Sequence, residues 1–213
     1  ILVLLLNSKY SLMKKKKILL VCHADSTTGL GHLSRLLALA QCLKKIDDLE
    51  IEFLIFGDNL INEELKFFTV KKLSIQNDFE HSIKNHINEQ HPVMVVFDLF
   101  PKLLPNNLQE LLLWIKEKRI KLVGIDSIKN YISLLDLVWV PTFYVNSINL
   151  YDNEKKIISG WNTLFIQKRL PNKEWKVGRR VLVLTGGSDT TNLRKQLPDI
   201  IDNTLRSDTI IDW

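Results

Sequence analysis

The feature that most constrains the fold is the stretch from Val21 to Arg35, VCHADSTTGLGHLSR. The apolar run Ile18 to Val21 leads into a loop of small and polar residues that closes on Gly29-Leu30-Gly31. After this loop the apolar residues recur at helical spacing, at Leu33, Leu36, Leu37, Ala40 and Leu43. We therefore predict a buried strand, a glycine loop and a helix. His32 falls in the first helical turn and Arg35 on the same side of the helix.

The predicted loop and helix start would suit an anionic ligand. The first amides of a helix have no intrahelical partner, and the helix dipole favours negative charge there. Gly29 and Gly31 would let a ligand approach the backbone closely. A histidine such as His32 can move a proton near neutral pH. On spacing alone, a capping or packing role for His32 stays open. The stretch lacks the third glycine of a dinucleotide fingerprint and the Gly-Lys-Ser/Thr of a phosphate loop.

Two segments resemble one known family. ADSTTGLGHLSRLLALA, residues 24–40, resembles the N-terminal signature of the UDP-sugar hydrolase of pseudaminic acid synthesis and of the related spore-coat polysaccharide proteins. RRVLVLTGGSDTTNL, residues 179–193, resembles the strand and GGSD loop that open the C-terminal domain of that family. The family shares the GT-B architecture of the MurG-type glycosyltransferases. The two motifs occur in the right order and at domain separation, which makes them more specific together than singly.

The resemblance implies a reaction and its residues. The two domains would clamp a UDP-sugar, which is hydrolysed at the anomeric carbon with release of UDP. His32 is the implied catalytic residue, because it matches the histidine of the G-x-G-H motif. The sugar would lie against the N-terminal loop. Residues implied or proposed for substrate binding are Gly29, Gly31, Arg35, Asp98 and Phe100; those for the nucleotide are Gly186, Gly187, Ser188 and Asp189. A structural salt bridge is an equal alternative for Arg35, as helix capping is for Asp98. The scheme needs no metal and no cofactor.

The sequence departs from the family pattern after the central strand. The hydrolases carry an Asp followed two residues later by Tyr, whereas this chain has Asp98 followed by Phe100. The paired aspartates after the next strand appear here as Asp126-Ser127. If the missing hydroxyl places sugar or water, the substrate or the reaction differs from that of the hydrolase.

Along the chain, strand and helix patterns alternate. We expect strands at 51–56, 68–73, 92–97, 121–125, 137–140, 181–184 and 209–213, and helices at 62–66, 79–89, from Pro105 as first helical residue, and from Asp189 to about Leu205. Such alternation predicts an α/β fold with a doubly wound, Rossmann-like parallel sheet of GT-B type. It would be followed by the start of a second Rossmann-like domain.

The composition of the chain suggests its domain boundaries. Residues 1–12 precede Met13 and a lysine run and are expected to be a non-native or disordered extension. Residues 13–166 would form the N-terminal sugar or acceptor domain. The basic segment 167–180 contains Pro171 and Gly178 and is interpreted as a linker. Residues 181–213 would begin an incomplete nucleotide-binding domain, so we expect the chain to be a fragment.

Charge and cysteine content narrow the choice of partners. The net charge is +5, and the lysines at 14–17 supply much of it without the aromatic-basic pattern of a nucleic-acid site. No apolar run is long enough to span a bilayer, although peripheral membrane association stays open. Cys22 and Cys42 show neither metal spacing nor a disulfide framework, and they are interpreted as packing residues in a reducing, cytoplasmic compartment.

Three functions compete at this stage. The first is the UDP-sugar hydrolase. The second is a GT-B glycosyltransferase, in which an acceptor hydroxyl replaces water. The third is a non-catalytic sugar- or partner-binding domain. Release of UDP without an acceptor would separate the first from the second.

Overall fold

A computed structural model describes residues 15–26, 28–57, 62–141, 156–160, 163, 178–183, 193–206 and 208–212. The strands are β1 (Lys16–His23), β2 (Leu49–Phe56), β3 (Thr69–Leu73), β4 (Met94–Asp98), β5 (Lys121–Ile125), β6 (Leu137–Val140), β7 (Ile157–Ser159), β8 (Arg180–Leu182) and β9 (Ile210–Asp212). The α-helices are α1 (Gly31–Leu43), α2 (Phe79–Gln90), α3 (Leu108–Glu117) and α4 (Leu193–Thr204). Short 3-10 helices are η2 (Glu63–Phe67), η3 (Pro101–Leu103) and η4 (Lys129–Tyr131).

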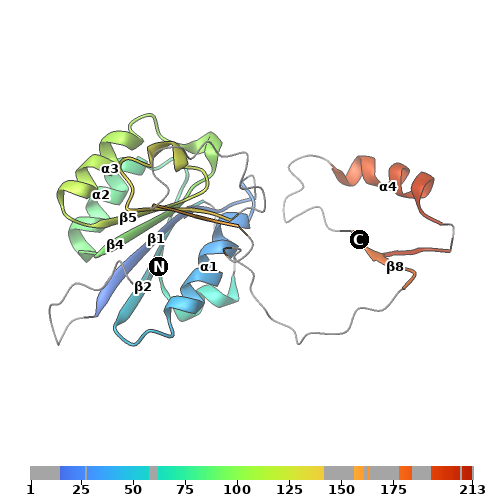
Figure 1. The fold of residues 1–213 in the computed structure, drawn as a ribbon, viewed down its shortest axis with the longest axis horizontal. Coiled ribbons are helices and arrows are strands. Elements are labelled where there is room, and N and C mark those ends of the chain that lie inside the picture. Colours follow the sequence, from blue (N-terminus) through green and yellow to red (C-terminus); the bar gives the residue numbers. More distant parts are fainter. Residues whose placement is uncertain are drawn as a thin grey trace.

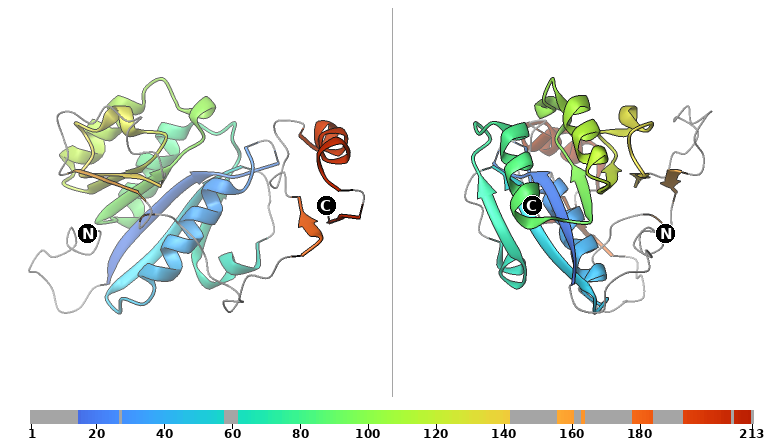
Figure 2. Two further views of the ribbon diagram at one scale, coloured as in Figure 1. Left: turned by 45° about the vertical axis from the view of Figure 1, so that its right-hand side comes forward. Right: turned by 90° about the vertical axis from the view of Figure 1, so that its left-hand side faces the viewer.

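Seven parallel strands form one sheet in the order β3-β2-β1-β4-β5-β6-β7. Helix α1 covers one face, and α2 and α3 cover the other (Figures 1 and 2). The strand order reverses between β1 and β4, because the chain builds outward from β1 in one direction and then returns to β4. The predicted doubly wound parallel sheet is therefore confirmed.

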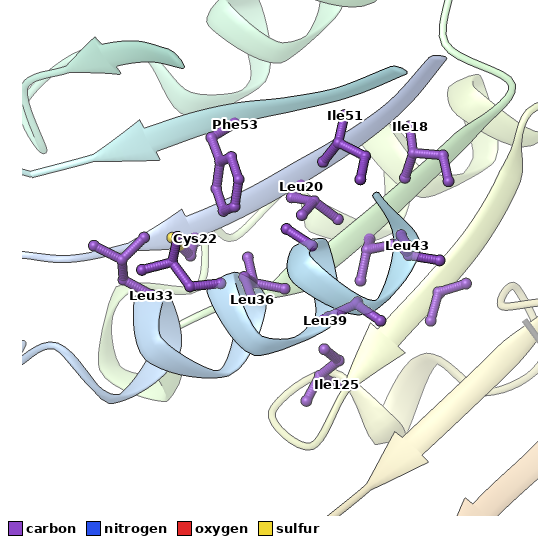
Figure 3. Packing of buried hydrophobic residues seen from close by; sticks show 14 of the residues in the cluster. Ile18, Leu20, Cys22, Leu33, Leu36, Leu39, Leu43, Ile51, Phe53 and Ile125 are labelled. Atoms are coloured by element: carbon purple, nitrogen blue, oxygen red, sulfur yellow. The ribbon is translucent and has the colours of Figure 1, made fainter. Parts of the chain in front are cut away.

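The central strands are buried on both faces. In β1 every residue from Ile18 to His23 is buried, which fits its continuous apolar sequence. On the α1 side, Leu20 and Cys22 of β1 pack against Leu33 and Leu36 of the helix (Figure 3). On the other side, the apolar stripe of α3 packs against β4 and β5; its members are Leu108, Leu111, Leu112 and Ile115, as the spacing predicts. Two hydrophobic layers thus hold the carboxyl ends of β1 and β4 in fixed positions.

Two glycines are needed for packing. A Cβ atom on Gly57, just after β2, would lie 1.9 Å from the carbonyl oxygen of Ala24. A Cβ atom on Gly124, in β5, would lie 2.6 Å from a side-chain carbon of Ile128. Neither position has room for a side chain, so both glycines let neighbouring segments approach closely.

Three details differ from the prediction. Helix α3 begins at Leu108 rather than at Pro105, with Asn107 at the N-cap position, where its side chain makes no capping hydrogen bond. The carbonyl of Pro105 instead accepts the amide of Leu108 in the preceding turn. The short strand β7 has no counterpart in the prediction. Cys22 is buried as expected, but Cys42 is exposed and is not a packing residue.

The C-terminal segment forms a separate pair of strands. β8 and β9 are parallel neighbours, and α4 lies between them in sequence, with Pro198 inside the helix. The first paired residue is Arg180, one position earlier than the predicted domain start. The β-α-β pattern is as expected. That it opens a second domain stays a prediction.

Candidate functional site

The site lies where β1 and β4 end side by side. Cys22 of β1 is the register partner of Asp98 of β4, so the loop after β1 and the last residue of β4 meet at one edge of the sheet. This is the point at which the strand order reverses. In open parallel sheets, the loops at such a point diverge and leave a crevice in which ligands bind. The fold therefore brings His32 and Asp98 together although 66 residues separate them.

The loop between β1 and α1 holds its own shape. Asp25 Oδ1 accepts hydrogen bonds from the Thr28 amide at 2.6 Å and from the Thr28 hydroxyl at 3.0 Å. The amide of Gly29 donates to the carbonyl of Asp25 at 3.0 Å. Gly29 has φ 78°, a left-handed conformation that favours glycine. The loop is thus preformed by bonds within itself and places Gly31 and His32 at the start of α1.

Gly31 differs from Gly29 in having no structural need for glycine. A Cβ atom on Gly31 would have no heavy atom within 4 Å, and Gly31 is the first residue of α1. No acidic residue stands in the first turn of that helix. Because the first amides of a helix have no intrahelical partner, the open space beside Gly31 would suit an anionic group.

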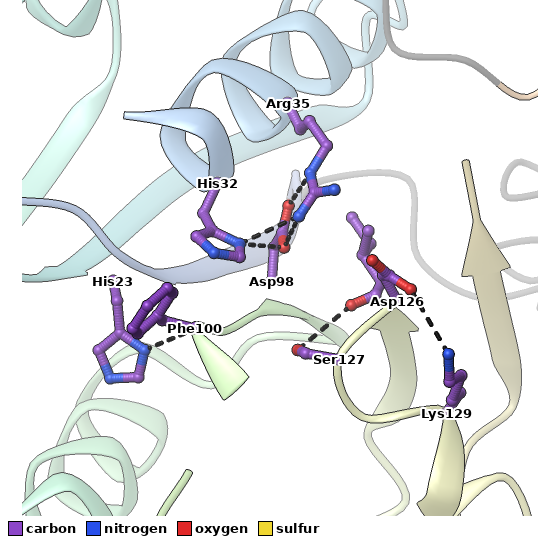
Figure 4. Close-up of polar contacts among 9 residues, drawn as sticks. His23, His32, Arg35, Asp98, Phe100, Asp126, Ser127 and Lys129 are labelled. Atoms are coloured by element: carbon purple, nitrogen blue, oxygen red, sulfur yellow. Dashed lines mark hydrogen bonds and ion pairs between the residues drawn. The ribbon is translucent and has the colours of Figure 1, made fainter. Parts of the chain in front are cut away.

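Asp98 is the centre of the polar contacts (Figure 4). Its side chain is fully buried, and both carboxylate oxygens are bonded. Arg35 Nε donates to Oδ2 at 2.8 Å, and Arg35 Nη2 donates to Oδ1 at 2.7 Å. This is the fork-shaped arrangement that makes arginine–carboxylate pairs strong. Asp98 is therefore not a helix cap, and Arg35 forms the salt bridge that the sequence left open.

His32 completes the cluster. Its Nδ1 lies 2.7 Å from Asp98 Oδ1, and its side chain is 13% exposed. Because the carboxylate can only accept, the geometry favours a proton on Nδ1, which donates to Oδ1. Arg35 Nη2, 3.0 Å from the same nitrogen, is then an adjacent cation rather than a second hydrogen-bond partner of Nδ1. In this tautomer Nε2 carries a lone pair and can accept a proton.

Phe100 and His23 border the cluster. The Phe100 ring meets His32 edge-on, with the centroids 6.0 Å apart and an interplanar angle of 79°. His23 Nδ1 accepts the backbone amide of Phe100 at 3.1 Å. Burial lowers the pKa of His23 to about 4, and nearby His32 acts in the same direction. The side chain of His23 is thus buried and uncharged at neutral pH, and its bond to Phe100 was not foreseen.

The buried thiol of Cys22 is the register neighbour of Asp98. Burial raises the pKa of Cys22 far above its ordinary value, and the charge of Asp98 acts in the same direction. The thiol therefore stays protonated, and it is inert as a nucleophile.

Asp126 lies beyond the cluster, after β5. Its φ is 51°, an uncommon value for a residue other than glycine, and its side chain is 48% exposed. Its carboxylate lies 4.0 Å from Lys129 Nζ.

The structure describes some of the predicted site residues and not others. His32, Arg35, Asp98 and Phe100 meet in space, and the loop with Gly29 and Gly31 adjoins them. The predicted nucleotide loop, Gly186 to Asp189, lies outside the described residues. Within the described residues, no group of three or more His, Cys, Asp or Glu side chains could hold a metal ion, and no helix is long and apolar enough to cross a membrane.

No protein-family model matches the sequence, and no curated protein is significantly similar to it. In three dimensions the chain is similar to the crystal structure of MurG from Acinetobacter baumannii, with a TM-score of 0.53 and 13% identity over 90% of this chain and 56% of that one. It is likewise similar to a UDP-N-acetylglucosamine 2-epimerase, with a TM-score of 0.54 and 12% identity over 93% and 63% of the two chains. The likeness is one of fold. It confirms the predicted GT-B type, and the chain spans between 56% and 63% of the length of these two proteins.

Proposed function

We propose that the chain supplies the sugar-side half of a nucleotide-sugar-processing enzyme, and that His32 is its general base. The observation that carries the proposal is the 2.7 Å contact between His32 Nδ1 and Asp98 Oδ1 at the switch point of the sheet. A carboxylate that holds one imidazole nitrogen orients the ring and stabilises the imidazolium that forms during proton transfer. The name of the epimerase with the same fold also points to a UDP-sugar.

The favoured reaction is hydrolysis of a UDP-sugar. Water attacks the anomeric carbon while His32 Nε2 takes one of its protons. The new carbon–oxygen bond forms as the bond from the anomeric carbon to the diphosphate oxygen breaks, and UDP leaves with the bonding electrons. The imidazolium that results is stabilised by Asp98, whose charge is shared with Arg35. Because UDP leaves as a stable anion, this step needs no metal ion in the scheme.

A glycosyltransferase is the second candidate, and Phe100 is the observation that favours it. In the hydrolase pattern a tyrosine stands at this position, whereas here an apolar ring faces His32. Phe100 lacks the tyrosine hydroxyl, so it cannot form a polar contact with the sugar or with the attacking water. An acceptor hydroxyl that brings its own contacts could take the place of water, with His32 again removing the proton.

The deciding experiment measures UDP released by the full-length gene product from a panel of UDP-sugars, with and without candidate acceptors. Release of UDP and free sugar without acceptor supports the hydrolase. Release only with an acceptor supports the transferase. Formation of an epimeric UDP-sugar without net sugar release would contradict both. A third outcome, saturable UDP-sugar binding with no turnover under any condition, would favour the non-catalytic binding domain.

A further inference from the structure

His23 is a buried polar residue beside the site, and the proposed reaction does not use it. It is the last residue of β1 and is 3% exposed. Its ring lies against Phe79 and Phe56, with centroids 5.6 Å and 6.1 Å away. Burial between these rings is the main cause of its low pKa, and nearby His32 adds to it, while the charge of Asp25 acts in the opposite direction without cancelling them. A neutral imidazole has one nitrogen that accepts a hydrogen bond, and burying that nitrogen without a donor would cost free energy.

The hydrogen bond that His23 accepts joins two loops of the site. Nδ1 receives the backbone amide of Phe100 at 3.1 Å, across 77 residues of sequence. Nδ1 must therefore carry the lone pair and Nε2 the proton. Phe100 lies two residues past β4, and its ring meets His32 edge-on. The end of β1 thus holds the backbone of the residue whose side chain borders the predicted base.

We propose that His23 is a positioning residue, which holds Phe100 against His32 and thereby fixes the imidazole orientation that presents Nε2 to the ligand. The catalytic use of that orientation rests on the proposed function, whereas the orientation itself can be measured in the protein without ligand. Asp98 controls His32 from the Nδ1 side. The Phe100 ring contacts the imidazole edge-on from another side, and in this proposal the two contacts together hold its orientation. A histidine that served the core alone would leave the state of His32 unchanged when replaced.

Two substitutions at residue 23 separate the roles. In His23→Asn the side-chain oxygen occupies nearly the place of Nδ1 and still accepts the Phe100 amide. In His23→Leu the volume is retained but the acceptor is lost. His91→Asn is the matched control, because His91 is an exposed histidine far along the chain whose φ of 50° asparagine tolerates.

The first measurement is nitrogen-15 NMR of histidine-labelled full-length protein at neutral pH. Wild type should show His23 protonated at Nε2 and His32 protonated at Nδ1. In His23→Leu the His32 signals should shift or broaden, whereas in His23→Asn and His91→Asn they should stay at their wild-type positions. Unchanged His32 signals in folded His23→Leu would overturn the proposal.

A second variant decides the matter if His23→Leu does not fold. Phe100→Leu removes the ring that faces His32 but keeps the backbone amide. This variant should perturb the His32 signals, and His23→Asn in the same background should add nothing. If the His32 signals of Phe100→Leu match those of wild type, the contact does not position His32 and the proposal fails.

The activity assay distinguishes failure of this proposal from failure of the proposed function. With an active wild type, His23→Leu should lower kcat by about tenfold to a hundredfold with little change in KM, which is the scale of a small misplacement of a reacting group. His23→Asn should restore most of kcat. An inactive wild type with the expected NMR pattern would overturn the proposed function and leave the positioning intact. An active wild type whose kcat is unchanged in His23→Leu would overturn the positioning role.

Discussion

Two histidine–carboxylate pairs each join a helix to a strand of the same sheet, and they differ in position, hydrogen bonding and burial. His32 and Asp98 meet at the carboxyl ends of β1 and β4, and all the carboxylate oxygens are hydrogen-bonded. His86 of α2 and Glu52 of β2 lie 3.1 Å apart beneath the helix, with side chains only 2% and 5% exposed. That contact is not in hydrogen-bonding geometry. Among the described residues, neither ring nitrogen of His86 nor Glu52 Oε2 has a hydrogen-bond partner.

The difference shows that residue types alone do not make a site. Lys17 is the nearest cation to Glu52, with its Nζ 3.9 Å from Oε2, and the same Nζ donates to Gln90. In the part of the chain that the structure describes, the pair thus has a cation nearby but no hydrogen bond at His86 or at Glu52 Oε2, and it is almost completely buried. A buried pair of this kind costs desolvation that its attraction repays poorly. Position at the strand ends, completed hydrogen bonds and partial exposure distinguish His32.

The largest effect is expected from Asp98→Asn. An amide in place of the carboxylate can donate a hydrogen bond to Nδ1 and so favours the wrong tautomer of His32. Turnover of a UDP-sugar by the full-length protein should fall by about four orders of magnitude, as in other histidine–carboxylate catalysts. Glu52→Gln is the matched control at the other pair and should leave turnover within about twofold of wild type. An equal loss of turnover in Asp98→Asn and Glu52→Gln would contradict the claim that only the pair at Asp98 takes part in the reaction.

A pH effect on stability is expected from His23. Its pKa is about 4 in the folded protein and near 6.5 in an unfolded chain, so the unfolded chain binds more protons between these values. The free energy of unfolding should therefore rise as pH increases from about 4 to 6.5, by up to roughly 3.4 kcal/mol, and this increase should be lost again as pH falls. Urea unfolding across this range measures the effect. His23→Asn should flatten the curve, whereas His91→Asn should not; a wild-type curve no steeper than that of His23→Asn would refute the assignment.

An increase in stability is expected when the buried pair is replaced. Glu52→Met together with His86→Leu keeps similar volume and removes both desolvated groups. The free energy of unfolding should rise by about 1–3 kcal/mol, as apolar replacement of buried ion pairs often allows. Either single substitution should be destabilising, because it leaves one charged or polar group without its neighbour. Denaturant unfolding of the three variants tests this, and a double variant less stable than both singles would be contrary to the account.

The smallest effects distinguish the two glycines of the loop. Gly31→Ala should stabilise the free protein by about 0.5–1 kcal/mol, because the added methyl meets nothing and alanine suits a helix. Gly29→Ala should destabilise it by about 1 kcal/mol because φ is 78°. If Gly31 is kept for a ligand, the same Gly31→Ala protein should bind a UDP-sugar more weakly. Calorimetric titration checks this, and undiminished affinity would remove Gly31 from the site.

Local sequence patterns predicted most strands of the sheet. The grouping of the site residues could not be predicted from such patterns, because it depends on the order of the strands in the sheet. The apolar run of β1 and the spacing of α1 placed His32 and Arg35 on one side of a helix, since both signals lie within a few residues. That Asp98 joins them depends on β4 pairing with β1, a contact that skips β2 and β3 and leaves no local trace. The bond from His23 to Phe100 was missed for the same reason. β7 was missed because three residues carry too little pattern.

The central claim is that His32 acts as the general base of the site. Its most direct test is turnover of a UDP-sugar by His32→Ala in the full-length protein, with His86→Leu as the matched histidine control. The account predicts that His32→Ala lowers turnover by about two to four orders of magnitude, the usual share of a general base, with nucleotide affinity little changed. His86→Leu should remain active. Turnover of folded His32→Ala equal to that of wild type would contradict the account.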